Sequence, residues 1–258
     1  MHKQMRMAGW LGSERKSDEK VVPFENCDFV FVSAPFASEP PVSKIVEHFF
    51  PEDPKRQWFE RIQNEEAGVR YLGLDVGLKH IEDALEKEGP FDGIFGFSQG
   101  AGLSLVVAAK QQQGEMLGNN PPLKFAIVIA GKENEENEGK TEGKCSLLCV
   151  VVVFFLTKKT FLLLVDSHVS SSFFFVLFYL LLLGFRARDM TLSNLFEEKL
   201  VCPTLHIWGD QDILRYKSEE VTEYCTDPII LRHKAGHKIP HVNTIDCTKI
   251  ESFINNLL

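Results

Sequence analysis

A serine between two glycines is the first candidate for chemistry in this chain. Residues 96–100 read Gly-Phe-Ser-Gln-Gly and match the pattern G-x-S-x-G. A strand-like run (93–97) precedes Ser98 and an apolar, helix-like run follows it. A sharp strand-to-helix turn there would lift the serine oxygen out of a sheet, with the backbone N–H of Gln99 facing a developing oxyanion. Ser98 is the predicted nucleophile and Gln99 the predicted oxyanion donor. The alternative is a glycine-rich turn with a solvated serine.

A serine nucleophile requires a general base, and the base requires a carboxylate that orients it. After an expected strand at 204–208 the chain reads Gly-Asp-Gln-Asp over 209–212. Both acids are candidates. Asp212 lies deeper in the loop and is preferred, Asp210 is the alternative, and either could be a solvated turn residue.

Three histidines are candidates for the base. His237 lies in the loop Ala-Gly-His-Lys-Ile-Pro (235–240), where the preceding glycine lets the chain approach the serine closely. We therefore predict that His237 is the base. His233 is expected to be a polar residue at a strand end and His241 a surface residue, while His206 lies inside a strand pattern and is expected in the core.

These residues need a scaffold of alternating strands and helices. Short apolar runs typical of buried strands occur at 29–35, 93–97, 124–130, 204–208 and 228–231. Helical spacing or an apolar run predicts helices at 75–88, from the serine to about 112, and at 250–257. Such alternation predicts an α/β fold with a mostly parallel sheet. Residues 36–70 are expected to cross the surface without regular elements. Trp58 and Phe59 in this stretch could cover an acyl pocket or simply pack.

Composition excludes several classes of function. The chain has 258 residues, a net charge of −8 and no block of Lys or Arg, which argues against nucleic acid and anionic membrane partners. The six cysteines are scattered without a C-x-x-C pair, and residues 1–20 contain no apolar leader. We therefore expect reduced thiols, no cofactor, no metal, and a cytoplasmic location that could extend to the nucleus.

Residues 143–185 differ from everything around them. The stretch 146–183 has no Ala, Gly or Pro, and the wider segment holds eight of the 21 Phe. Its edges at Gly-Lys-Cys (143–145) and Phe-Arg (185–186) can be encoded by splice-donor and splice-acceptor sequences. We interpret about 143–185 as a retained intron. The alternatives are a genuine apolar insertion or lid, and a membrane hairpin, although the longest apolar run of 11 residues is short of the roughly 20 that a spanning helix needs.

Several stretches together resemble the FSH family of serine hydrolases. They are FVFVSAPF (29–36), GPFDGIFGFSQGA (89–101), PPLKFAIVIAG (121–131), PTLHIWGDQD (203–212) and DPIILRHKAGHKIP (227–240). The resemblance implies an α/β-hydrolase-like three-layer sandwich and a small-molecule carboxylic ester as substrate. Carried over by position, it implies that Ser98 is the nucleophile, Asp212 the acid and His237 the base of an acyl-enzyme mechanism.

Two departures from the family pattern matter. Nothing in the family resembles residues 144–184, so we expect one hydrolase domain (1–258) interrupted at about 143–185, with no membrane partner unless residues 150–183 belong to the mature protein. Family members also begin with a strand and a loop that supplies a second oxyanion N–H, and residues 1–13 resemble the helix after that loop. We therefore expect weak or absent activity, because the loss of one oxyanion donor lowers the rate about 10²- to 10³-fold. The alternative function is a non-catalytic truncated or pseudo-hydrolase that binds a small acyl ligand.

Overall fold

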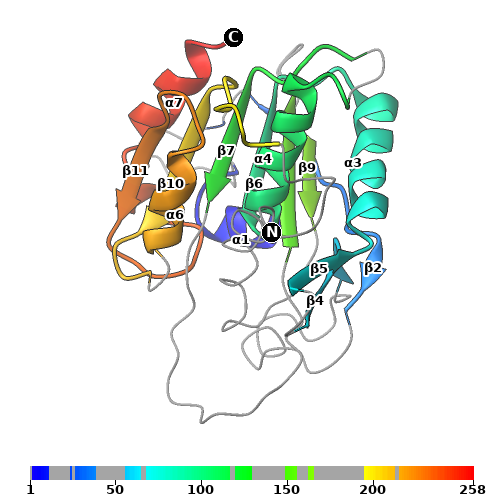
Figure 1. Cartoon of the computed structure of the whole chain (residues 1–258). Coiled ribbons are helices and arrows are strands. Elements are labelled where there is room, and N and C mark those ends of the chain that lie inside the picture. Colours follow the sequence, from blue (N-terminus) through cyan, green and yellow to red (C-terminus); the bar gives the residue numbers. More distant parts are fainter. Residues whose placement is uncertain are drawn as a thin grey trace.

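The computed structural model describes residues 2–11, 24, 27–38, 56–64, 68–116, 120–129, 149–155, 162–165, 195–212 and 215–258 (Figure 1). Its helices are α1 (His2–Met7), α3 (Leu74–Glu88), α4 (Gln99–Gln112), α6 (Arg215–Thr222) and α7 (Cys247–Asn255), with a 3-10 helix η1 (Val242–Thr244). Its strands are β1 (Asp28–Val30), β2 (Phe36–Ala37), β3 (Arg56–Gln57), β4 (Glu60–Asn64), β5 (Gly68–Leu72), β6 (Gly93–Ser98), β7 (Phe125–Ile129), β8 (Cys149–Phe155), β9 (Leu162–Val165), β10 (Thr204–Gly209) and β11 (Ile229–His233).

A parallel block of four strands forms the centre of the fold. The main sheet has the order β1-β8-β6-β7-β10-β11, and β6, β7, β10 and β11 run parallel to one another. Every residue of β7 and β10 is buried, as expected of parallel strands covered on both faces. Helix α4 packs against β6, β7 and β8. The predicted α/β fold is therefore confirmed, with a mixed sheet around a parallel centre.

The helix before the central strand forms where the spacing predicts it. Helix α3 buries Leu74, Ile81 and Leu85 on one face, and it ends at Glu88 with Gly89 as its C-cap. It begins after Gly73, whose φ of 79° lies in the left-handed region that favours glycine. The predicted range 75–88 agrees with the observed helix to within one residue.

The stretch from 36 to 70 contains more regular structure than the sequence predicted. Strand β2 pairs with β3, and β4 pairs with β5, each in an antiparallel two-stranded sheet. A short ribbon satisfies its backbone groups by local pairing and does not need the apolar runs that mark central strands. The expected strand at 29–35 is shorter than predicted, because only Asp28–Val30 pair in the sheet.

Part of the segment at 143–185 lies inside the main sheet. Strand β8 runs antiparallel to both β1 and β6, and β9 also pairs antiparallel with β8. The remainder of 143–185 lies outside the described residues. Strand pairing uses backbone groups that every sequence has, so it does not test the retained-intron interpretation, which stays a prediction. Within the described residues, no helix combines the length and hydropathy required to cross a bilayer.

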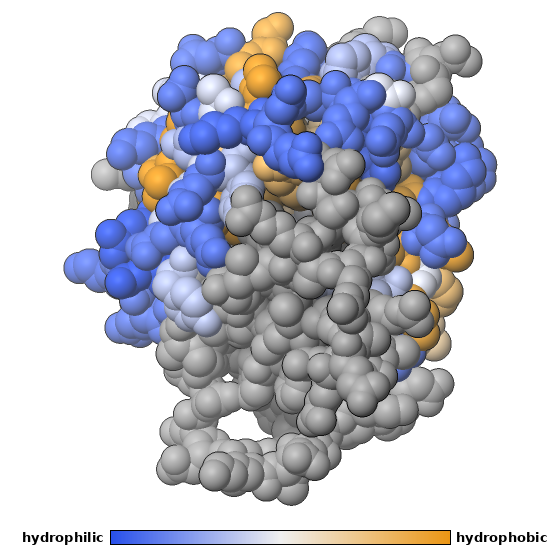
Figure 2. Space-filling view, viewed as in Figure 1, coloured by the Kyte–Doolittle hydropathy of each residue, from blue (hydrophilic) through white to orange (hydrophobic). Residues whose placement is uncertain are grey.

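The surface seen in Figure 2 is mostly hydrophilic over the described residues, with small apolar patches between the charged side chains. The large apolar side chains are inside. Trp10, Trp58, Trp208, Phe95 and Phe125 are all essentially inaccessible to solvent. A core this rich in aromatic rings draws together α1, the central strands and the 56–59 segment.

Candidate active site

The expected strand-to-helix junction is present at Ser98. Ser98 is the last residue of β6, and Gln99 is the first residue of α4. A side chain at Gly96 would collide with the carbonyl oxygen of Gly100 and the hydroxyl of Ser104. The Ser104 hydroxyl itself donates to the Gly100 carbonyl at 2.8 Å. The glycine therefore allows the strand and the first turn of the helix to approach as closely as the elbow requires.

The side chain of Gln99 ties the start of α4 to the segment before β4. Gln99 is 3% exposed, and its Oε1 accepts a hydrogen bond from the backbone N–H of Trp58 at 3.3 Å. Trp58 and Phe59 are both buried, and Phe59 packs edge-on against Tyr71 with ring centroids 5.5 Å apart. These two aromatic residues are therefore part of the core next to the elbow, which agrees with the packing alternative.

Asp212 lies buried in the turn after β10. Its side chain is 1% exposed, and its Oδ2 lies 3.7 Å from Nδ1 of His237. The turn is held by the Asp212 N–H, which donates to the Gly209 carbonyl at 3.1 Å, and by the Arg215 N–H, which donates to the Asp212 carbonyl at 3.0 Å. The structure thus brings one of the two candidate acids to the candidate base.

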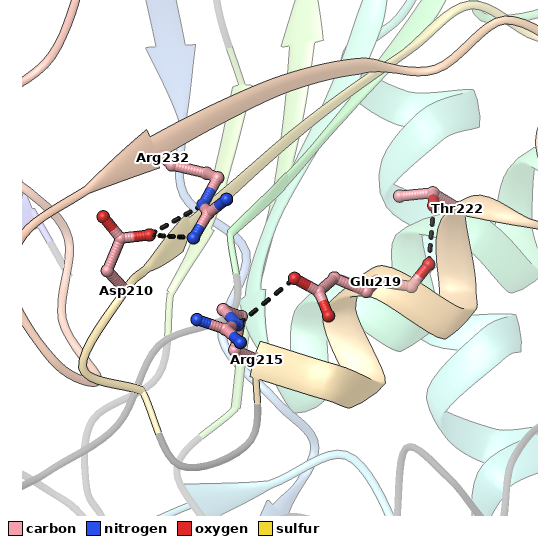
Figure 3. Close-up of polar contacts among 5 residues, drawn as sticks. All are labelled: Asp210, Arg215, Glu219, Thr222 and Arg232. Atoms are coloured by element: carbon pink, nitrogen blue, oxygen red, sulfur yellow. Dashed lines mark hydrogen bonds and ion pairs between the residues drawn. The ribbon is translucent and has the colours of Figure 1, made fainter.

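The other candidate acid has a different environment. Asp210 forms an ion pair with Arg232 of β11, whose Nη2 and Nε both lie 2.6 Å from Oδ1 (Figure 3). The two side chains are 41% and 49% exposed. Figure 3 also shows that α6 begins with a separate ion pair between Arg215 and Glu219 at 3.2 Å. Asp210 therefore belongs to a surface ion pair that joins β10 to β11.

His237 lies between the acid turn and the nucleophile strand. Its side chain is 14% exposed, and its ring packs against Phe97, with centroids 5.5 Å apart and an interplanar angle of 55°. Phe97 directly precedes Ser98. The histidine loop docks on the acid turn through the Gln211 N–H, which donates to the Ala235 carbonyl at 3.3 Å. Gly209 leaves no room for a Cβ against the same carbonyl.

The other histidines have structural environments. His233 is 2% exposed, and burial lowers its pKa to about 4. His206 is 1% exposed with Nε2 3.0 Å from the Thr204 hydroxyl, and burial lowers its pKa to about 3. His241 is exposed, and its Nδ1 accepts from the Asn243 N–H at the start of η1. Burial keeps the first two imidazoles neutral, so neither has the properties of a base that exchanges protons near neutral pH.

The described residues hold no cluster of three or more His, Cys, Asp or Glu that could bind a metal ion. Two of the described thiols, Cys202 and Cys225, are also poor nucleophiles. Burial raises the pKa of Cys202 to about 12 and the pKa of Cys225 to about 11, which keeps both protonated at neutral pH.

Sequence reasoning missed three contacts around the site. They are the Gln99 hydrogen bond to Trp58, the Arg232 ion pair with Asp210, and a hydrogen bond from Trp10 Nε1 to the Pro240 carbonyl at 2.5 Å. The last joins residues 230 positions apart. No spacing or periodicity in a single sequence signals such a contact.

Comparisons with known proteins point to one family. A family model described as "Serine hydrolase (FSH1)" matches residues 11–246. Esterase OVCA2 of Homo sapiens is 26% identical over 253 residues, which cover 91% of this chain and 87% of the human protein. Esterase OVCA2 of Xenopus tropicalis is 25% identical over 170 residues, or 65% of this chain and 50% of that protein.

A third relative has a different name. A protein named dihydrofolate reductase in Schizosaccharomyces pombe (strain 972 / ATCC 24843) is 25% identical over 188 residues, which are 71% of this chain but 29% of the yeast protein. The chain thus covers half or less of the yeast and frog relatives. No solved structure matches the chain. Because the family model extends over most of the chain and the resemblance seen in its motifs agrees with that match, this chain belongs to the FSH1 serine hydrolase family.

Proposed function

We propose that this protein is a serine esterase that cleaves small carboxylic esters through an acyl-enzyme. The observation that carries the proposal is the contact of His237 with Asp212 on one side and with Phe97, the neighbour of Ser98, on the other. Family membership and relatives named esterases support the same reaction class.

In the proposed reaction, Ser98 attacks the ester carbonyl while His237 removes the proton from its hydroxyl. The carbonyl carbon gains a bond to the serine oxygen, and the electron pair of the C=O bond moves onto the oxygen. The backbone N–H of Gln99, at the start of α4, donates to that oxyanion. The oxyanion then re-forms the C=O bond, the C–O bond to the alcohol breaks, and His237 gives its proton to the leaving alcohol. Water attacks the acyl-enzyme in the same way, and the bond to the Ser98 oxygen breaks to release the acid.

Asp212 is the proposed orienting acid. A buried carboxylate next to Nδ1 favours the tautomer in which Nε2 can accept the serine proton, and it stabilises the imidazolium that forms. The alternative acid, Asp210, is engaged by Arg232 at the surface. The contrast between the two environments is the reason to place Asp212 in this role.

The proposal also covers the domain organisation, the cofactor, the location and the substrate. The chain is one hydrolase domain over 1–258 that is interrupted at about 143–185, it needs no cofactor, and it acts in the cytoplasm on a small-molecule ester.

The test is labelling by a fluorophosphonate together with hydrolysis of short p-nitrophenyl esters by the full-length chain. Ser98→Ala should abolish labelling and reduce kcat on the order of 10⁶-fold. Ser252→Ala, a change at an exposed serine of α7, is the matched control and should retain both signals. A wild-type chain that is folded but neither labels nor hydrolyses any ester would reject the proposal and favour the acyl-binding pseudo-hydrolase.

A further inference from the structure

We propose that Trp10 is a positioning residue that holds the histidine loop in its place beside the nucleophile strand. The proposal rests on the proposed function, in which His237 is the base. It assigns a role in catalysis to a side chain that lies far from Ser98, Asp212 and His237 in the sequence.

The far end of the histidine loop is fastened to the segment after α1. The indole Nε1 of Trp10 donates to the carbonyl of Pro240 at 2.5 Å. Next to this bond, the Val242 N–H donates to the Ala8 carbonyl at 2.9 Å. Gly9, with a φ of 77°, packs so closely on Val242 that a Cβ would lie 2.8 Å from its Cγ2. Two hydrogen bonds and one close packing contact therefore join 8–10 to 240–242.

Trp10 also packs on the nucleophile strand. Its ring meets Phe95 edge-on, with centroids 5.9 Å apart and an interplanar angle of 83°. It also packs on Phe24 at 5.5 Å. Phe95 lies on β6, three residues before Ser98. One buried indole thus contacts the strand that ends at the nucleophile and the loop that carries the base.

His237 sits between two anchors of its loop. The near anchor is the bond from the Gln211 N–H to the Ala235 carbonyl, and the far anchor is the bond from Trp10 to the Pro240 carbonyl. Without the far anchor, the buried Pro240 carbonyl loses this donor and the loop gains freedom to move. A displacement of about 1 Å in a catalytic group can lower a rate 10²-fold, so a remote hydrogen bond can control turnover.

A matched pair of tryptophans separates positioning from packing. Trp208 is as buried as Trp10, but its Nε1 has no hydrogen-bond partner among the described residues. Trp10→Phe and Trp208→Phe therefore remove similar amounts of buried ring, and only the first removes a hydrogen bond. Replacing Trp10 with 3-benzothienylalanine, which has sulfur in place of the indole N–H, keeps the ring shape and removes the donor alone.

Two readouts apply to the full-length variants. In ester hydrolysis, both Trp10 variants should lower kcat by about 10- to 100-fold. KM should stay within about twofold of wild type, because the loop acts on the chemical step. Trp208→Phe should keep the wild-type kcat even if its melting temperature is lower. In NMR spectra, the His237 ring protons, identified by their loss in His237→Asn, report the ring's place against Phe97. Their shifts should change in both Trp10 variants and stay unchanged in Trp208→Phe.

Different results would reject the esterase proposal and the positioning role of Trp10. A wild-type chain without Ser98-dependent turnover would reject the esterase proposal, yet the His237 shifts would still decide whether Trp10 places the loop. If the benzothienylalanine variant keeps the wild-type His237 shifts, the positioning role is wrong. Wild-type kcat in that variant of an active enzyme would overturn it equally. Should Trp10→Phe fail to fold, the isosteric variant carries the test.

Discussion

Exchanging a single carboxylate for an amide at Asp212 tests the geometry of the site most directly. In Asp212→Asn the side chain keeps its size but loses the charge that faces His237. The Asp212 Oδ2 lies 3.7 Å from His237 Nδ1, and the Asp212 side chain is 1% exposed. At an effective dielectric constant of about 20, that separation corresponds to about 4 kcal/mol of attraction for the imidazolium. At about 1.4 kcal/mol per factor of ten, kcat should fall about 10³-fold.

Asp210→Asn is the matched control, because it makes the same chemical change two residues away. This change breaks an ion pair with Arg232 whose side chains are 41% and 49% exposed. Such pairs contribute about 0–1 kcal/mol to stability, so the variant should melt slightly earlier and keep kcat within about twofold.

The assay is kcat for a p-nitrophenyl ester at saturating substrate, with the rate of fluorophosphonate labelling as a second measure of serine activation. Circular dichroism confirms that each variant is folded. The reasoning is refuted if Asp212→Asn keeps more than about a tenth of wild-type kcat, because the loss would then be far smaller than expected. It is also refuted if Asp210→Asn proves the more damaging change.

Three further outcomes follow from the structure. Gly96→Ala places a methyl group against the Gly100 carbonyl and should lower the free energy of unfolding by about 1–3 kcal/mol, measured by urea denaturation. Gln99→Ala removes the acceptor of the Trp58 N–H and should lower the free energy of unfolding by about 1–3 kcal/mol. Gln99→Glu keeps an acceptor, so hydrogen exchange at the Trp58 amide should be much slower in this variant than in Gln99→Ala. His206 has a folded pKa of about 3 against 6.5 unfolded, so below pH 6.5 the unfolded chain binds a proton that the folded chain does not. Stability should therefore fall by about 2 kcal/mol from pH 7 to pH 5, and thermal melting of His206→Asn should show a correspondingly weaker dependence on pH.

The central elements were predictable because their signals are local. The runs at 124–130 and 204–208 are mostly apolar, and each contains residues of a central strand. The glycines on both sides of Ser98 predicted the strand-to-helix junction that β6 and α4 form. Patterns of this kind involve neighbouring residues, so a single sequence is enough to predict them.

Contacts between distant segments were not predictable in the same way. The loop positions of Asp212 and His237 suggested a pair, but the burial of one acid and the exposure of Asp210 depend on how β10 and β11 pack. Trp10 and Pro240 meet only because the fold brings together two segments that lie 230 residues apart in the sequence. The two-stranded ribbons within 36–70 were not predicted, because their strands are short and lack the apolar runs of the core.

Strand β8 has a consequence for the connectivity of the sheet. In the described pairings, β1 joins the other strands through β8, and β8 also flanks the nucleophile strand β6. Removing residues 143–185 would therefore remove β8 and β9, separate β1 from the parallel strands and leave the six residues of β6 without hydrogen-bond partners along one edge. An open edge recruits another strand. A spliced and an unspliced message would thus encode two different sheets around the same serine, not one sheet with and without an appendage.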